Sequence, residues 1–274
     1  MNRKLRTPPK RLIAIFLYIF VCYSLYGQDS KEEDAAALAK QSANPIANLI
    51  SIPIQANLNF GFGDYNRTRT VVNIQPVIPF RLSSKVNVIN RIIIPIMFLP
   101  ENAESGGTSG LGNINYSVFF VPAKAGKFTW GIGPAFNIPT LTDDKLGANA
   151  FGIGPTAVGL LMLDKWVIGA TFNRLWSYNG SSVNSFFGQY FITYNIKKGW
   201  YVNTNPNIVA NFNAPDGEQW TVPFGLGGGK VTHFGSQPVK LQLQYYYNAV
   251  RPTGGAESSI QITMVFLFPK KSKG

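Results

Sequence analysis

The sequence has very little of the side-chain chemistry on which most enzymes and disulfide-bonded proteins depend. Its 274 residues include one cysteine, Cys22, and one histidine, His233. A single cysteine cannot form an internal disulfide or a cysteine-rich metal site. A single histidine leaves almost no base to activate a serine or cysteine nucleophile. We therefore predict that the chain is not an enzyme, and we expect no catalytic residues, no metal site and no cofactor.

Charge is scarce as well. Charged residues make up 14% of the chain, against about 25% in typical soluble domains. Five of the basic residues lie within residues 1–27, which hold no acidic residue, so the formal net charge of +12 overstates the charge of the remainder. The other basic residues are spread over turns and tails, whereas a nucleic-acid interface needs a clustered basic face. We expect no nucleic-acid partner.

Long apolar runs are almost absent. One such run, "LIAIFLYIFVCYSLYG", follows the basic residues of the N-terminus. It is shorter than the about 20 residues that a membrane-spanning helix needs, and we interpret residues 1–27 as a signal peptide. Residues 28–47 are acidic and alanine-rich, which predicts a short periplasmic helical segment that ends before Pro45. No later apolar run is long enough for a transmembrane helix.

Alternation of apolar and polar residues dominates the chain after residue 47. Such a period of two is typical of β-strands, and several segments exceed the usual 5–6 residues of a globular strand. Short turns and longer loops alternate between the segments, which is typical of an outer-membrane barrel. The twelve segments are 48–63, 68–81, 85–99, 111–122, 128–139, 149–163, 165–176, 184–196, 199–212, 219–231, 238–250 and 258–268.

These features predict an all-β fold: a transmembrane, antiparallel, up-and-down β-barrel of about 12 strands over residues 48–270. Residues 271–274 form a basic tail, and both termini are expected in the periplasm of a Gram-negative bacterium. Eight prolines fall inside the predicted strands, where each removes a ladder donor. We expect bulges or strand ends at Pro53, Pro76, Pro79, Pro95, Pro134, Pro155, Pro206 and Pro223.

The two phases of the alternation differ in chemistry. One phase is apolar, as in Ile260, Ile262, Met264, Phe266 and Phe268, and is expected to face outer-membrane lipid. The other is rich in asparagine and glutamine, which donate and accept hydrogen bonds without a fixed charge. The candidate residues of the lumen and solute pathway are Asn57, Asn59, Asn73, Gln75, Asn87, Arg91, Asn115, Asn137, Asn173, Gln189, Asn205, Asn207, Gln242 and Gln244.

The five tryptophans all fall near the ends of predicted strands. Three follow short turns and two flank long loops. Aromatic residues form girdles at both interfaces of membrane barrels, although a tryptophan near a strand end is also common in ordinary packing. The expected membrane-interface girdle comprises Trp130, Trp166, Trp176, Trp200 and Trp220.

Several segments, taken together, resemble one known family from Leu38 to Lys270. The chain is similar to the outer-membrane proteins grouped with the meta-pathway of phenol degradation. That resemblance implies an outer-membrane barrel with an uptake or channel role, and it implies neither catalytic residues nor an agreed substrate. The segments are "LAKQSANPIANLISIPIQANLNFGFG", "NIQPVIPF", "GLGNINYSVFFVPAKAGKFTWGIGPAF", "WTVPFGLGGGKV", "QPVKLQLQYYYNAVRP" and the closing "FLFPK".

Two functions remain open from the sequence. The first is an outer-membrane channel or transporter that passes or binds a small-molecule solute through a polar, Asn/Gln-rich lumen. The second is a closed structural or assembly barrel without transport activity, because any barrel lumen is polar. In either case the C-terminal strand resembles the signal recognised by barrel-assembly machinery, which is the expected partner during biogenesis.

Overall fold

The computed structural model describes residues 29–101, 103, 106–124, 126–177 and 183–269. The predicted signal peptide and the predicted basic tail lie outside these residues. In the described part of the chain, no helix is long and apolar enough to cross a bilayer. Apart from one α-helix and two three-residue 3₁₀ helices, the regular secondary structure of the described residues is β-strand.

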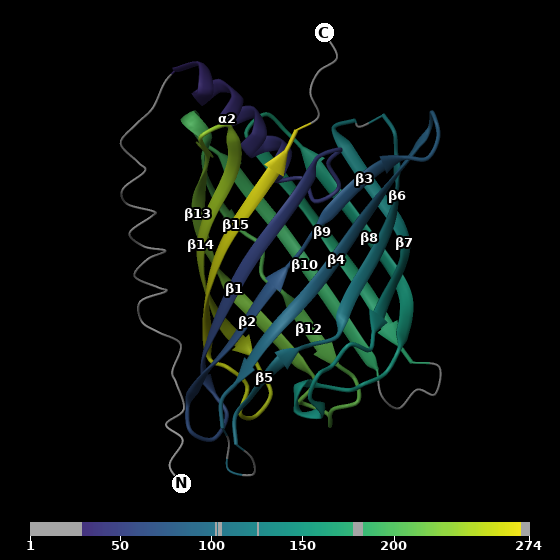
Figure 1. Cartoon of the computed structure of the whole chain (residues 1–274), viewed down its shortest axis with the longest axis vertical. Helices are drawn as coiled ribbons and strands as arrows, with labels where there is room; N and C mark the ends of the chain where they lie inside the picture. The colour runs from purple at the N-terminus through teal and green to yellow at the C-terminus, as the bar shows by residue number, and fades with distance from the viewer. Residues whose placement is uncertain (1–28, 102, 104–105, 125, 178–182, 270–274) are drawn as a thin grey trace.

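The described strands form one antiparallel sheet that closes on itself (Figure 1). β1 pairs with β15 to close the barrel, and β9 pairs with β10. Three barrel strands are each made of two segments, β2 with β3, β5 with β6, and β11 with β12, so the fifteen segments make the twelve predicted barrel strands. The segments are β1 (Ile50–Phe62), β2 (Arg67–Ile74), β3 (Val77–Arg81), β4 (Val86–Leu99), β5 (Thr108–Leu111), β6 (Ile114–Pro122), β7 (Phe128–Ile138), β8 (Gly152–Met162), β9 (Trp166–Trp176), β10 (Asn184–Asn195), β11 (Trp200–Thr204), β12 (Ile208–Asn211), β13 (Trp220–Phe234), β14 (Gln237–Val250) and β15 (Ser258–Phe268).

The register between β1 and β15 shows why closure works. Ile54 lies opposite Met264, and Gln55 lies opposite Thr263. Because side chains alternate between the two faces of a strand, this register keeps the apolar phases of both strands together on the outer face. The expected lipid-facing row of β15 is therefore continuous with the isoleucines of β1.

Two prolines mark the interruptions of barrel strands. Pro76 separates β2 from β3, and Pro206 separates β11 from β12. In β13 the register with β14 shifts between Val222 and Pro223, as at a bulge. Pro79 lies on β3 beyond the one residue of that strand, Val77, that pairs with β1. The prediction of bulges or strand ends is confirmed at Pro76, Pro206 and Pro223.

The prediction is wrong at the other five prolines, which lie inside continuous strands. At Pro53 and Pro95 the interruption lies in a neighbouring strand. Opposite Pro53, for example, the ladder is broken between β2 and β3, and the Pro53 carbonyl still accepts a hydrogen bond from the N–H of Gln75. The missing N–H donor is tolerated where no carbonyl of the neighbouring strand is left without a partner. The five are Pro53, Pro79, Pro95, Pro134 and Pro155.

The helix α2 (Asp29–Ser42) lies across the end of the barrel that carries the short turns (Figure 1). This helix falls within the predicted helical segment. Its buried residues Ala35, Leu38 and Ala39 pack in one cluster with residues of the barrel, among them Tyr201 and Leu267. The start of β1 and the end of β15 lie at this same end. We call it the α2 end, and the opposite end the loop end.

Two carboxylates hold loops in place by hydrogen bonds at the loop end. Asp143 accepts hydrogen bonds from the Thr108 hydroxyl at 2.6 Å and from the N–H of Lys145 at 2.9 Å. These bonds, that of Thr108 first, lower the pKa of Asp143. Glu218 accepts hydrogen bonds from the N–H and the hydroxyl of Thr253, which lower the pKa of Glu218. Hydrogen bonds to a carboxylate favour its charged form.

We expect the loop end to loosen in acid. Because the folded-state pKa values are depressed, the hydrogen bonds of the two carboxylates are fully present above the ordinary carboxyl pKa of about 4 and are lost as pH falls through the folded values. Hydrogen exchange of loop peptides, corrected for the intrinsic rate, should rise between about pH 5 and pH 3. Asp143→Asn and Glu218→Gln should remove most of this pH dependence. Equal pH dependence of hydrogen exchange in the wild type and the variants would show that Asp143 and Glu218 do not stabilise the loop end.

Candidate functional site

The register places the predicted lumen residues that lie in strands on the inner face of the barrel. Asn57 pairs with Gln261, and Asn73 pairs with Gln55, whose side chain lines an internal cavity. Asn115 pairs with Asn137 on the same face. Asn205 and Asn207 lie in the interruption between β11 and β12 instead. Asn205 nevertheless lines the internal cavity. That these residues form a solute pathway stays a prediction.

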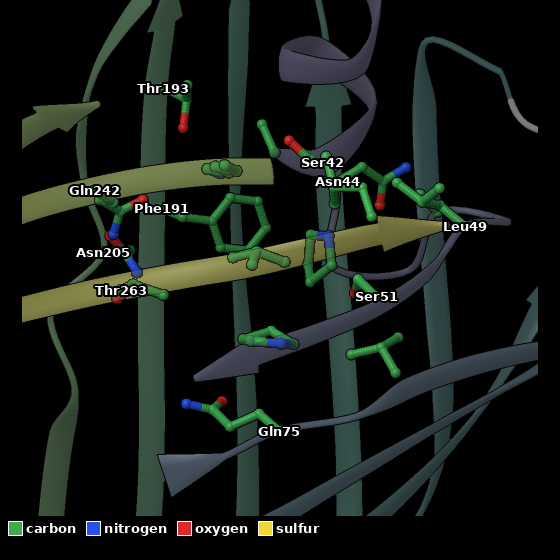
Figure 2. A pocket seen from close by; sticks show the side chains of 18 of the residues that line it. Ser42, Asn44, Leu49, Ser51, Gln75, Phe191, Thr193, Asn205, Gln242 and Thr263 are labelled. Carbon is green, nitrogen blue, oxygen red and sulfur yellow. The ribbon is translucent and has the colours of Figure 1, made fainter. Parts of the chain in front are cut away.

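An internal cavity of about 160 Å³ lies next to the segment that joins α2 to β1. Figure 2 shows side chains from several strands around this space. Its wall combines amides and hydroxyl groups with apolar side chains such as Phe191 and Val265. Five predicted lumen residues line it: Gln75, Arg91, Gln189, Asn205 and Gln242. The other nine do not: Asn57, Asn59, Asn73, Asn87, Asn115, Asn137, Asn173, Asn207 and Gln244.

A network of amides holds the interruption between β11 and β12 in place. Gln242 Nε2 donates to Gln244 Oε1 at 2.5 Å, and Gln244 Nε2 donates to Asn205 Oδ1. From β10, which pairs with both β11 and β12, Gln189 Nε2 donates to Asn207 Oδ1 at 2.7 Å and to the carbonyl oxygen of Asn205 at 3.1 Å. Buried polar groups need such partners. These amides therefore have a structural task in addition to facing the lumen.

Two cations line the cavity. Arg91 projects from β4 and donates to Gln75 Oε1 at 3.1 Å. Lys240 projects from β14 with 8% of its surface exposed, and its ammonium lies 4.7 Å from the ring centroid of Tyr201. Lys240 is absent from the predicted set. Its signal was in the sequence, because Lys240 shares the phase of Gln242 and Gln244, and a period of two puts it on the same inner face.

The α2 end of the lumen is apolar, which the sequence did not predict. Ile46, in the segment between α2 and β1, is only 4% exposed and packs in a cluster with inward residues of five strands. We call this the Ile46 cluster. It closes the α2 end with hydrophobic packing, whereas an Asn/Gln-rich lumen was expected. Its buried members are Ile46, Ile89, Phe119, Val121, Val158, Leu160, Val167 and Phe191.

All five tryptophans are exposed on the outer face near strand ends. Trp166 packs against Tyr194 with ring centroids 4.7 Å apart, and the ammonium of Lys230 lies 5.2 Å from the Trp200 ring. Trp130, Trp166 and Trp200 lie toward the α2 end. Trp176 and Trp220 lie at the loop end. The two groups lie at opposite ends of the barrel, all on strands from β7 to β13. That they form a membrane-interface girdle stays a prediction.

The family model described as "Putative MetA-pathway of phenol degradation" matches residues 70–262, more than half of the chain. The chain belongs to this family. The resemblance carried by the sequence motifs is thereby confirmed. No curated protein matches the chain.

Solved structures similar to this family member are outer-membrane proteins. The "COG4313 outer membrane channel from Pseudomonas putida F1" superimposes with a TM-score of 0.61 and 13% identity, over 80% of this chain and 95% of that one. The "CymD monoaromatic hydrocarbon channel" gives a TM-score of 0.48 and 10% identity, over 90% and 94%. The first of these shows a shared outer-membrane barrel fold. Both of these proteins are channels by title, not enzymes.

Within the described ranges, no group of three or more His, Cys, Asp or Glu side chains is placed to hold a metal ion. The candidate site is therefore the lumen itself. Its chemistry is binding: amide donors and acceptors, two cations and an apolar floor, enclosed by a wall of paired strands.

Proposed function

We propose that this protein is an outer-membrane channel for small solutes that combine an apolar body with a polar group. The observation that carries the proposal is the internal cavity, whose wall joins amides such as Gln189 and Gln242 to apolar side chains such as Phe191 and Val265. Pockets that select small molecules are mostly apolar with a few placed polar groups. Family membership supports the same class, since the family description names the degradation of phenol.

The orientation is part of the proposal. Short turns lie on the periplasmic side of outer-membrane barrels and longer loops lie outside. The α2 end is then periplasmic, and both described chain ends lie on that side. The two groups of tryptophans mark the lipid interfaces, and the apolar outer face between them contacts outer-membrane lipid. Barrel-assembly machinery is the proposed partner during insertion, and β15 is the strand it would recognise.

A closed barrel without transport is the second candidate, and the Ile46 cluster favours it. Buried side chains of β4, β6, β8, β9 and β10 pack against Ile46, and we infer that solute passes the α2 end only when this segment moves. The channel proposal therefore requires the segment between α2 and β1 to leave its seat transiently. Local opening of a small packed unit is a common property of folded proteins.

Conductance of the purified, refolded protein in planar bilayers separates the two candidates. A channel should show discrete current steps, and benzyl alcohol, a small solute with an apolar ring and one hydroxyl, should interrupt them in a concentration-dependent manner. Heat-modifiable gel migration establishes that the protein is folded. A folded protein that carries no current, with or without solute, would favour the closed barrel.

A further inference from the structure

The cavity contains two cations and no compensating carboxylate. Arg91 and Lys240 both line it, and none of its other lining residues is aspartate or glutamate. Neither cation is in a salt bridge between described residues; Arg91 donates to a neutral amide, and Lys240 rests on an aromatic ring. None of the described strands contains a carboxylate, and the side chain of Asp34 on α2 is exposed.

Two like charges inside a barrel are costly without a partner. Removing a charge from water carries a large desolvation penalty, which an opposite charge or good hydrogen bonds must offset. Charges of the same sign also repel each other, and the repulsion grows as the surroundings exclude water. An anion bound between Arg91 and Lys240 would offset both costs. The cavity wall therefore favours an anionic ligand.

A hydroxyl on the same wall is also without a partner. Thr263 is 7% exposed and lines the cavity, and its Oγ1 makes no hydrogen bond. In β14–β15 register, Thr263 pairs with Gln242 and the adjacent Val265 position pairs with Lys240. The hydroxyl oxygen of Thr263 has almost no accessible surface, so an occupant of the cavity could reach it only after a small movement of the wall. Its unmet hydrogen-bonding capacity adds to the polar character of this wall, and the two cations carry the argument for an anion.

The rest of the wall restricts what that anion can be. Leu49, Val77, Phe191, Val265 and Leu267 contribute apolar surface. A small inorganic ion would leave this surface unused. The volume of about 160 Å³ is close to that of an engineered protein cavity of about 150 Å³ that binds benzene. A single ring with one charged group matches both the volume and the mixed chemistry.

We propose that the cavity is a binding site for small organic carboxylates, with the carboxylate held by Arg91 and Lys240 and the apolar body against Phe191 and Val265. This assignment names the substrate class of the proposed channel and rests on that function for its role in the cell. The binding itself does not require conduction. A carboxylate accepts hydrogen bonds from guanidinium and ammonium donors, and charge-assisted bonds of this kind are the stronger ones.

Calorimetry on the refolded protein in detergent tests the site with two matched probes. Benzoate and benzamide share ring and size and differ in charge. Benzoate should bind about tenfold or more tightly than benzamide to the wild-type protein, because the buried cations favour only the anion. Equal affinity for the two probes, or no benzoate binding by the folded protein, would overturn the proposal.

Variants assign the effect to the two cations. Arg91→Gln and Lys240→Gln should each reduce benzoate affinity by about tenfold and leave benzamide affinity unchanged. Lys240→Arg keeps the charge and should keep the preference for benzoate. Lys230→Gln, which removes a lysine beside Trp200 on the outer face, is the matched control and should change nothing. Benzoate affinity that survives both cavity substitutions, or falls equally in the Lys230 control, would refute the assignment.

A failure of the binding-site proposal is distinguishable from a failure of the channel proposal. Calorimetry detects the site in a barrel that never conducts, and bilayer recordings detect conduction in a barrel that does not prefer benzoate. If a cavity variant does not refold, as judged by heat-modifiable migration, the conservative Lys240→Arg variant and the comparison of benzoate with benzamide in the wild type still decide the question.

Discussion

Replacing Ile46 with alanine is expected to open the α2 end of the barrel. The side chain is 4% exposed in a cluster formed with five strands. A large-to-small change at such a site costs about 2–5 kcal/mol, and every 1.4 kcal/mol changes an equilibrium by about tenfold. The segment between α2 and β1 should leave its seat at least about tenfold more often. Planar-bilayer recordings should show a correspondingly higher open probability.

The control for this variant is conservative. Ile46→Val removes one methyl group and costs about 0.5–1.5 kcal/mol, so it should raise the opening equilibrium by about two- to tenfold, less than Ile46→Ala does. Hydrogen exchange should show that the added opening is confined to residues near the segment and spares β14 and β15. An Ile46→Ala protein that is folded and conducts like the wild type would show that the Ile46 cluster is not the gate.

Placing an arginine on the outer face of β14 should destabilise the inserted barrel. Leu243 lies near the middle of β14, and 51% of its surface is exposed on the side that faces away from the lumen. An arginine at the bilayer midplane costs about 2–4 kcal/mol on the lipid face of a barrel. Leu243→Arg should therefore lower the free energy of unfolding from lipid vesicles, measured in urea, by about that amount.

Asn57→Arg is the matched comparison. Asn57 lies near the middle of β1 on the inner face, where its amide pairs with the amide of Gln261 at 2.8 Å. An arginine there reaches the lumen, but the Asn57 side chain gives up three hydrogen bonds, with Gln261, Gln55 and the carbonyl oxygen of Val71, at about 0.5–1.5 kcal/mol each. Asn57→Ala loses the same three bonds, so Asn57→Arg should be about as stable as Asn57→Ala, whereas Leu243→Arg should be less stable than Leu243→Ala. An equal penalty of arginine relative to alanine at the two positions would mean that the faces of β1 and β14 are assigned wrongly.

The Leu243 and Asn57 variants test the same assignment of strand faces to lipid and lumen. The lipid face and the lumen are two environments separated by the thickness of one strand, and a period of two decides which residue meets which. The Ile46 cluster adds a third, dry environment at the α2 end. In the proposed channel, a solute would meet the amides and the two cations of the cavity as well as this apolar cluster.

Much of the fold could be predicted because its determinants are local. Alternation located the twelve barrel strands to within a few residues, and the two kinds of connection placed the short turns and long loops at opposite ends. Segment 149–163 is apolar in both phases, so its faces were not readable from the pattern. In the structure Val158 and Leu160 of β8 are buried in the Ile46 cluster while Leu161 is exposed.

By itself, then, the sequence determined the barrel, its strand number, the face of each alternating residue and the family resemblance. These follow from a side-chain period and from turn residues, which act over a few positions along the chain. Lys240 was absent from the predicted set, although its alternation with Gln242 and Gln244 indicates the same inner face.

Only the tertiary structure decided which inward residues meet. Arg91 on β4 and Lys240 on β14 line one cavity although about half of the chain separates them, and Ile46 reaches strands on the far side of the lumen. Such meetings depend on how the strands tilt and stagger when the sheet closes, and closure joins β1 to β15 across the whole sequence. No local pattern encodes that geometry, because it is a property of all twelve strands at once.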